Sequence, residues 1–267
     1  IPDQNGEQAS RHMLSAVKTL GAEDLLLCLL SGGGSSLLAL PIDGISLHDL
    51  QQITHQLLCC GASIQEINTA RKHLSAIQGG KLAAACKAPI CALIISDVTG
   101  DQATHIASGP CTPDPTTFSD ALAVLDHYHL NVPPPIKQKL LAGKNQPLDE
   151  TPKPGSPIFT HVANKIIASA HQSLSAAADY FQRHQISALI LGDTVTGESR
   201  EIAKGYAALV KEIRFHPQWL KAPIALLSGG ETTVTIKGEG RGGRNAEFLL
   251  SLLIELAGMA DVYALAC

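Results

Sequence analysis

Short apolar runs along the chain alternate with longer stretches in which apolar residues recur at helical spacing. Strands are predicted at residues 25–30, 91–95, 159–163, 188–191, 225–227, 233–236 and 262–266. Helices are predicted at residues 8–20, 47–59, 68–77, 81–86, 118–127, 166–184, 198–213 and 246–256. This alternation predicts an α/β fold with mostly parallel sheets, in which functional residues follow the carboxyl ends of the strands.

Two proline-rich segments without periodicity, 133–135 and 147–157, indicate a stiff polar connection. We place a domain boundary there, which gives an N-terminal α/β domain at residues 1–155 and a C-terminal α/β domain at residues 156–267. The chain opens in a polar turn and closes in a predicted strand. We therefore expect it to be a piece of a longer protein.

Composition excludes several classes of function. The 267 residues carry a net charge of −4 and a pI near 6.3, which disfavours a nucleic-acid-binding protein. No apolar run approaches the ~20 residues that span a bilayer, and the first residues lack a signal-peptide pattern, so a cytoplasmic protein is expected. The seven cysteines are interpreted as reduced thiols, and no zinc-ligand spacing is present.

The most informative segment runs from Ser228 to Phe248. It contains two glycine turns around a strand pattern, places Arg241 and Arg244 in the second turn, and leads into an apolar helix. Glycines let backbone N–H groups approach a ligand, and guanidinium groups match the oxygen pairs of phosphate or carboxylate. The segment therefore predicts an anion site.

Two familiar nucleotide motifs are nearly matched. Residues 238–243 satisfy G-x-G-x-x-G, but the preceding strand alternates polar and apolar residues, unlike a buried strand that leads into a dinucleotide turn. Residues 192–199 approach the P-loop pattern, with Glu198 where the phosphate-binding lysine is required. We reject a Walker-type site because the charge is reversed.

Three other segments carry candidate chemistry. Three consecutive glycines follow the first strand and favour a nest of N–H groups for an anion. Arg71 and Lys72 share one helix face, which is either a solvated surface or a ligand-facing one. Asp97 and Asp101 follow the second strand, where they are either helix caps or oxygen ligands for Mg²⁺ carried in with a nucleotide.

Taken together, these motifs resemble the glycerate 2-kinase family, the class II glycerate kinases formerly named hydroxypyruvate reductases. The matching segments are 2–3, 31–35, 68–75 with 79–80, 96–101, 106–110, 197–201 and 228–247. The resemblance implies ATP- and Mg²⁺-dependent phosphorylation of D-glycerate to 2-phosphoglycerate. It also implies two α/β/α domains with Rossmann-like sheets and an active-site cleft between them.

The resemblance implies roles for particular residues. Arg241 and Arg244 are assigned to phosphate or to the glycerate carboxylate, with Arg71 and Lys72 in the same anionic site. Asp97 and Asp101 are assigned to Mg²⁺, or to the substrate hydroxyl. Further binding groups are expected from Ser31, Gly32, Gly33, Gly34, Ser35, Ser228, Gly229, Gly230, Thr232 and Asn245. The proton acceptor stays open among Asp193, Glu198 and Glu231.

This chain also departs from the family pattern. Ala246 stands where Gln is common and Lys81 where Arg is common. The family's Gly-Lys-Ala stretch, with a lysine thought to be catalytic, and its Asp-Thr-Asp-Gly turn are both outside these residues. Two other functions stay open: an NAD(P)-dependent hydroxypyruvate reductase and a non-catalytic sugar-acid-binding protein. The sequence leaves the oligomeric state open, with a homodimer as one possibility.

Overall fold

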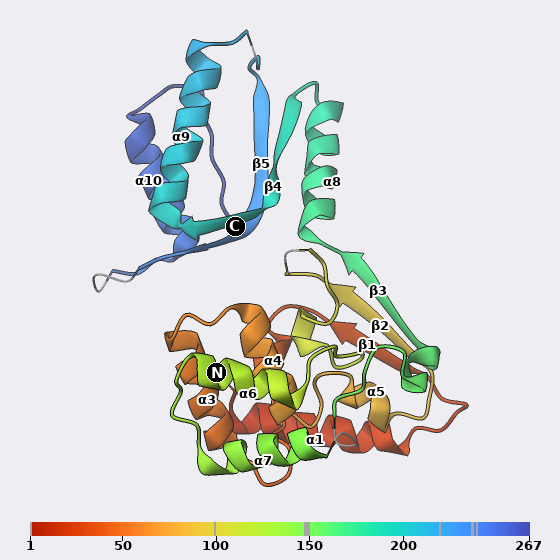
Figure 1. Cartoon of the computed structure of the whole chain (residues 1–267). Coiled ribbons are helices and arrows are strands. Elements are labelled where there is room, and N and C mark those ends of the chain that lie inside the picture. The colour runs from red at the N-terminus through yellow and green to blue at the C-terminus, as the bar shows by residue number, and fades with distance from the viewer. Residues whose placement is uncertain (1, 99, 147–149, 219, 236–237, 239) are drawn as a thin grey trace. The chain divides into compact units, whose positions relative to one another are not determined.

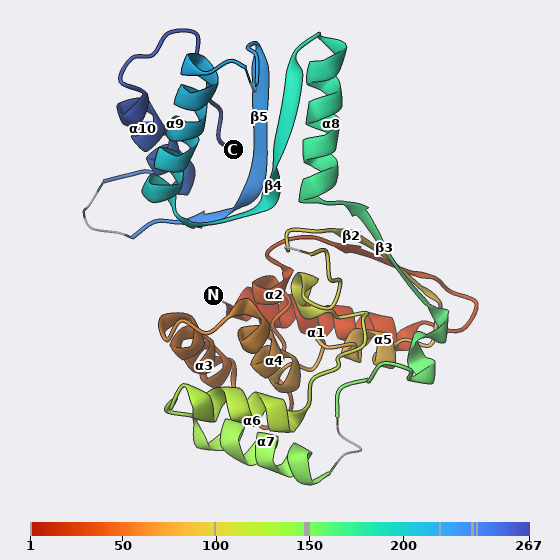
Figure 2. The same ribbon diagram turned by 45° about the horizontal axis from the view of Figure 1, so that its top comes forward.

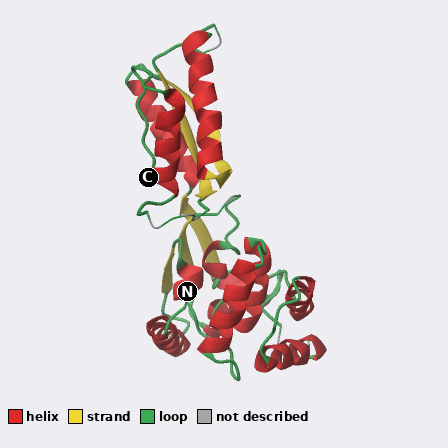
Figure 3. Ribbon diagram, turned by 90° about the vertical axis from the view of Figure 1, so that its left-hand side faces the viewer, coloured by secondary structure: helices red, strands yellow, loops and turns green. Residues whose placement is uncertain are grey.

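The computed structural model describes residues 2–98, 100–146, 150–218, 220–235, 238 and 240–267. The chain divides into two compact units, Ile1–Ser169 and Ala170–Cys267. Helices and parallel strands alternate in both units, which confirms the predicted α/β class (Figure 3). In the described part of the chain, no helix is long and apolar enough to cross a membrane.

Unit 1 contains a three-stranded parallel sheet in the order β1-β2-β3. Its strands are β1 (Leu26–Leu30), β2 (Ile90–Ile95) and β3 (Val162–Ala168). Its helices are α1 (Gln4–Thr19), α2 (Gly34–Leu37), α3 (Leu47–Cys59), α4 (Ile64–Leu74), α5 (Lys81–Ala85), α6 (Phe118–His127) and α7 (Pro134–Asn145), with 3₁₀ turns at Ile106–Ser108 and Pro157–His161.

Two hydrophobic clusters stabilise unit 1. The first joins the inner face of the sheet, including Cys28 and Ile94, to Val17 of α1 and Leu82 of α5. Figure 2 shows α1 and α5 on one side of the sheet. The second fills the space between α3, α4, α6 and α7. On the outer face of the sheet, Leu27 is exposed, since alternate residues of a strand point to opposite faces.

Unit 2 contains two parallel strands, β4 (Ser187–Glu198) and β5 (Ile224–Thr233). Helix α8 (Ala170–Arg183) lies on one side of this pair, and α9 (Ser199–Phe215) and α10 (Arg244–Leu256) lie on the other (Figure 1). The α9–α10 contact is built around buried Ala203, Ala207, Leu252 and Leu256. Small residues on α9 allow the two helices to pack closely.

Several helix starts follow directly from local sequence. Helices α3, α4 and α6 each begin with a capping box, in which a Ser or Thr hydroxyl accepts from the N3 amide while the N3 carboxylate accepts from the cap amide. The three pairs are Ser46 with Asp49, Ser63 with Glu66, and Thr117 with Asp120. Helix α4 therefore begins at Ile64, four residues before the start predicted from apolar spacing.

Other predicted elements differ from the structure. Residues 262–266 form no strand, and Val262 instead packs against the α9–α10 cluster. The strand predicted at residues 159–163 begins only at Val162, because residues 159–161 form a 3₁₀ turn. The helix predicted at residues 166–184 starts too early, because residues 166–168 belong to β3, which pairs with β2. Pro134 opens α7 rather than a stiff connection, because proline is compatible with the first turn of a helix. The end of the predicted strand 233–236 and parts of segments 96–101, 147–157 and 238–243 lie outside the described residues.

The division between the units also differs from the predicted boundary at residue 155. It falls after β3, because β3 pairs with β2. Residues preceding β3 are likewise held by unit 1. The Thr151 hydroxyl donates to Asp114 Oδ2 at 3.0 Å, and the Asp114 amide donates to the Pro152 carbonyl at 2.9 Å. Residues 150–157 therefore belong to the first unit.

Candidate functional site

The loops that follow β1 and β2 meet at the same edge of the unit 1 sheet. Gly32 lies so close to Asp97 that a Cβ atom built on Gly32 would be 2.4 Å from Asp97 Oδ2. A side chain at residue 32 would require the Asp97 carboxylate to move. Gly33 has φ +79° and begins the short helix that contains Gly34 and Ser35. The predicted glycine loop, Ser31 to Ser35, and the predicted carboxylate at residue 97 are thus neighbours.

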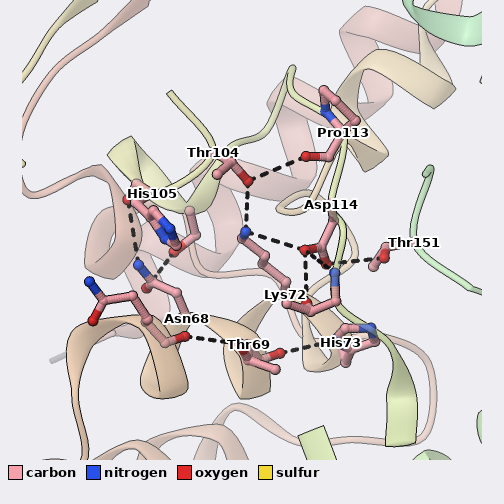
Figure 4. A network of polar contacts seen from close by, with 12 residues as sticks. Asn68, Thr69, Lys72, His73, Thr104, His105, Pro113, Asp114 and Thr151 are labelled. Atoms are coloured by element: carbon pink, nitrogen blue, oxygen red, sulfur yellow. Dashed lines mark hydrogen bonds and ion pairs between the residues drawn. The ribbon is translucent and has the colours of Figure 1, made fainter. Parts of the chain in front are cut away.

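A chain of hydrogen bonds connects this loop to α4. The buried Ser108 hydroxyl is 2.9 Å from Ser35 Oγ and 3.0 Å from Asn68 Oδ1. The Asn68 amide group reaches the His105 carbonyl at 3.5 Å (Figure 4). Buried polar groups are stable when they are satisfied in this way. The network fixes the glycine loop against α4.

The turn that supplies Ser108 has an unusual backbone. Ala107, Ser108 and Gly109 have φ values of 50°, 56° and 59°, three consecutive left-handed conformations. For residues other than glycine, such conformations cost on the order of 1–3 kcal/mol each and persist only where the surroundings enforce them. Ala107 contacts Gly34, where an added Cβ would be 2.6 Å from the Ala107 methyl. The strained turn at residues 107–109 therefore packs against the glycine loop.

Lys72 and Asp114 form a buried ion pair beside this turn. Lys72 Nζ is 3.3 Å from Asp114 Oδ1 and 2.8 Å from Thr104 Oγ1 (Figure 4). The Lys72 and Asp114 side chains are 2% and 0% exposed. Burial lowers the pKa of Lys72, although the Asp114 charge opposes this. For Asp114, burial raises the pKa, but the Lys72 charge and hydrogen bonds from Thr116 outweigh it, so the pKa is lowered.

This geometry differs from the ligand role predicted for Lys72. We expected its ammonium group to share an anionic site with Arg71, but it points into the protein toward Asp114. Adjacent residues on a helix point in directions about 100° apart, so the two cations separate. In the structure Lys72 holds the segment that contains Thr104 against α4.

Arg71 has a different environment. Its side chain is partly buried and lines a small cavity together with Ser35 and Gln78. Burial lowers the pKa of its guanidinium group. Within the described part of the chain it makes no hydrogen bond or ion pair, in contrast to the buried Lys72. Arg71 thus retains donors for an anion near the glycine loop.

The two candidate Mg²⁺ ligands follow β2. Asp97 is exposed and lies against Gly32, and Asp101 is partly buried with φ +52°. The described residues contain no group of three or more His, Cys, Asp and Glu side chains placed to hold a metal ion. Mg²⁺ commonly uses only one or two protein carboxylates and takes its other ligands from water and phosphate. An exposed carboxylate beside a glycine loop fits that pattern.

In unit 2, the predicted glycine loops are strand residues. Gly192, Asp193 and Glu198 belong to β4, and Ser228, Gly229, Gly230, Glu231 and Thr232 belong to β5. The parallel pairing continues through Val195–Gly230 and Glu198–Thr233, with irregularities near Gly192. A Cβ atom on Gly230 would be 2.1 Å from the Val195 carbonyl oxygen. Glycine is required here for the two strands to approach, so the expected free turns are incorrect.

Charged residues of unit 2 gather where β4 and β5 end and α9 and α10 begin. Arg244 pairs with Glu231 at 2.5 Å, and both side chains are exposed. Arg200 contacts Glu198 at 3.5 Å and Glu247 at 3.2 Å. Hydrogen bonds from Thr235 are the main cause that lowers the pKa of Glu198. The sequence did not indicate these pairings.

The remaining predicted residues of unit 2 lie nearby in the chain. Thr232 Oγ1 is 2.8 Å from Ser199 Oγ at the start of α9. Arg241 is exposed in the loop before α10, and Asn245 is exposed in the first turn of that helix. Asp193 is partly buried, and a Cβ atom built on Gly229 would lie 3.7 Å from the Asp193 Cβ. The N-terminal end of α10 thus carries the two predicted arginine positions.

Sequence reasoning missed Ser108 and Asp114, which organise unit 1, and Arg200 and Glu247 in unit 2. Ser108 belongs to segment 106–110, which matches the family pattern but carries no chemical signal of its own. A signal for Asp114 is absent from local sequence, since its partner Lys72 is 42 residues away.

Comparison with known proteins gives the context of this site. Residues 1–141 match the family described as "Domain of unknown function (DUF4147)", and residues 224–267 match the MOFRL family. A D-glycerate 2-kinase of Thermotoga maritima is 41% identical over 263 residues, which is 98% of this chain and 60% of that protein. A crystal structure of glycerate kinase from the same organism superimposes with a TM-score of 0.84 at 41% identity, covering 97% of this chain and 60% of that one.

The chain belongs to the glycerate kinase family. A protein of Agrobacterium vitis named "Putative hydroxypyruvate reductase" is 43% identical over 271 residues, covering all of this chain and 60% of that protein. The chain therefore spans about 60% of the length of these family members. The matched regions include both glycine segments and the strained turn at Ala107.

Proposed function

We propose that the protein containing this chain phosphorylates D-glycerate with ATP and yields 2-phosphoglycerate. The observation that carries the proposal is the 41% identity to a D-glycerate 2-kinase across 98% of this chain. The fold agrees, since a glycerate kinase structure superimposes with a TM-score of 0.84. Phosphoryl transfer depends mainly on positioning and on neutralising negative charge.

In unit 1, the proposed binding groups surround the glycine loop. The backbone N–H groups from Ser31 to Ser35, with the unpaired guanidinium group of Arg71, would hold a phosphate or carboxylate. Asp97 and Asp101 would hold Mg²⁺. Bound there, Mg²⁺ would neutralise part of the phosphate charge. Lys72 is proposed to position α4 through Asp114 rather than to bind substrate.

In unit 2, Arg244 and Arg241 would bind anionic oxygens at the start of α10, where the helix dipole also favours negative charge. Thr232 and Asn245 are proposed as neighbouring polar contacts. Arg244 would exchange its exposed Glu231 partner for the substrate. An exposed ion pair contributes only about 0–1 kcal/mol, so breaking the pair with Glu231 costs little free energy.

Among the three candidate proton acceptors, the contacts favour Asp193. Hydrogen bonds from Thr235 lower the pKa of Glu198, which weakens it as a base. Glu231 is paired with Arg244. Asp193 makes no hydrogen bond or ion pair with any residue that the structure describes, so its carboxylate is available.

The name of the Agrobacterium protein supports one alternative, reduction of hydroxypyruvate. β5 ends at Thr233, five residues before the motif behind that reading, at residues 238–243. In dinucleotide-binding folds the glycine turn joins the strand to the helix without such a gap. This difference favours the kinase.

The experiment is to incubate the full-length protein with D-glycerate, ATP and Mg²⁺, and separately with hydroxypyruvate and NADH or NADPH. We expect ADP formation in the first mixture and unchanged reduced cofactor in the second. Phosphorus NMR of the product distinguishes 2-phosphoglycerate from 3-phosphoglycerate. Cofactor oxidation without ADP would overturn the kinase, glycerate binding without turnover would indicate a sugar-acid-binding protein, and the 3-isomer alone would overturn the position of transfer.

The proton acceptor is tested with Asp193→Asn. We expect a large fall in kcat with little change in the KM for ATP, since general-base catalysis contributes roughly 10²–10⁴-fold. The matched control is Glu198→Gln, which removes a carboxylate from the same strand. An equal loss in both variants would contradict the assignment of Asp193.

A further inference from the structure

Unit 1 contains a second cavity, separate from the glycine loop. Its volume is about 520 Å³, and its walls come from α1, α5, α7, the first residue of α6 and residues 40–43. Among the described residues, four cationic side chains line it against one carboxylate, that of Asp43. The cations are Arg11, Lys18, Lys81 and Lys139.

Most of this positive charge forms no ion pair within the cavity among the residues that the structure describes. Arg11 is bound to Glu7 at 2.8 Å, outside the cavity lining. Lys18 and Lys139 make no hydrogen bond or ion pair with the residues that the structure describes. In the described part of the chain, Lys81 donates to two carbonyl oxygens, those of Lys72 and Ser75. Like charges that face a common space repel one another, and a bound anion removes that repulsion.

The state of Lys81 agrees with this geometry. Burial lowers the pKa of Lys81 to about 8, and the nearby positive charge of Lys139 acts in the same direction. Asp114 and Glu150 oppose the shift without cancelling it. An anion beside Lys81 would favour its charged form and raise the pKa.

The walls also indicate the kind of anion. Apolar side chains of Leu14, Leu40 and Phe118 line the cavity beside the cations. Its volume falls within the range of about 300–1,000 Å³ that is typical of small-molecule sites. The geometry points to a small phosphate ester as the ligand, with its phosphate held by Lys18, Lys81 and Lys139 and its carbon skeleton against the apolar wall.

Lys81 connects this cavity to the glycine loop. Its ammonium group donates to the Lys72 carbonyl at 2.9 Å and to the Ser75 carbonyl at 2.6 Å, at the end of α4. The two preceding residues, Gly79 and Gly80, donate their amides to the carbonyls of Ser108 and Gly109. A ligand that moves Lys81 therefore acts on the strained turn as well as on α4. Binding here would regulate the affinity of the glycine loop for its anion.

The test is calorimetric titration of the full-length protein with glycerol 3-phosphate, with glycerol as the uncharged control. The double variant Lys18→Met and Lys139→Met removes two charges and leaves α4 and the glycine loop unchanged. Lys144→Met, on the same α7 but outside the cavity lining, is the matched control. Hydrogen exchange of residues 4–19 and 134–145 locates the ligand.

We expect glycerol 3-phosphate to bind, glycerol not to bind, and the double variant to weaken binding by about tenfold or more, since each charge-assisted contact is stronger than a neutral hydrogen bond. Lys144→Met should bind as the unaltered protein does. Equal affinity in all variants, with protection elsewhere in the chain, would place the ligand at another site and overturn the proposal. An absence of binding in the unaltered protein would overturn it too. Neither result depends on which reaction the protein catalyses.

Discussion

Replacing Asp114 by Asn should strongly destabilise unit 1. The substitution keeps the shape of the side chain but removes the charge that faces Lys72 at 3.3 Å. Both groups are almost completely buried, so Lys72 would be left as an uncompensated charge, a change that typically costs about 3–5 kcal/mol. An unpaired Lys72 can instead lose its proton. With an unfolded-state pKa of about 10.4, deprotonation at pH 7 costs roughly 4.6 kcal/mol, which sets the upper limit.

The same reasoning fixes the pH dependence. Burial lowers the pKa of Lys72 and the Asp114 charge raises it, so removing that charge should lower the folded-state pKa further below its value in the unfolded state, and the unfolded chain then binds more protons. Stability must then rise with pH between these two values. By pH 9.5 deprotonation costs only about 1 kcal/mol, and the gap between the variant and the original protein should shrink accordingly.

The assay is hydrogen exchange of the α4 amides in residues 64–74, which reports the opening free energy of unit 1 even if unit 2 unfolds separately. The control is Glu7→Gln, which breaks the exposed pair with Arg11 and should cost less than about 1 kcal/mol. A loss below about 1 kcal/mol for Asp114→Asn at pH 7 would refute the reasoning. A loss that stays constant up to pH 9.5 would do the same.

Two further predictions concern glycine and arginine. Gly143→Ala places a methyl group 2.5 Å from the Phe118 ring and should cost about 1–3 kcal/mol, whereas Gly205→Ala, with nothing within 4 Å, should stabilise α9 by about 0.5–1 kcal/mol. Hydrogen exchange of each unit measures both, and a reversed order would contradict the packing. Arg244→Lys should lower kcat of the full-length enzyme by about 10²-fold, because a lysine cannot reproduce bidentate contacts. Near-normal kcat would show that Arg244 serves only to pair with Glu231.

The sequence predicted correctly those helices whose ends depend on residues close together in the chain. Helices α3 and α6 have the predicted bounds because apolar spacing and capping residues agree there. Residues 262–266 have a strand-like apolar pattern, but the pattern cannot tell whether a neighbouring strand is present. The glycines of residues 192–197 and 228–230 were misread for a similar reason. Close approach of two strands and a free turn both require glycine.

The candidate site also depends on contacts between residues far apart in the chain, which local sequence reveals only in part. Proximity of Gly32 and Asp97 was foreseeable, because the ends of neighbouring parallel strands lie at one edge of a sheet. The Lys72–Asp114 pair was not foreseeable, since it joins residues 42 positions apart through a turn whose path depends on the whole unit. The shared helix face of Arg71 and Lys72 therefore did not reveal that Lys72 points into the protein toward Asp114.

The contact between Gly34 and Ala107 has a consequence for the evolution of the family. The space between these two positions holds a single methyl group, and at present that methyl belongs to Ala107. Gly34 lies in a helix, where alanine is favoured, while Ala107 has φ +50°, where glycine is favoured. Exchanging the two residues would keep the volume and relax the backbone, whereas alanine at both positions would not fit. Homologous sequences should therefore show these two positions covarying, so that a methyl group gained at one is lost at the other.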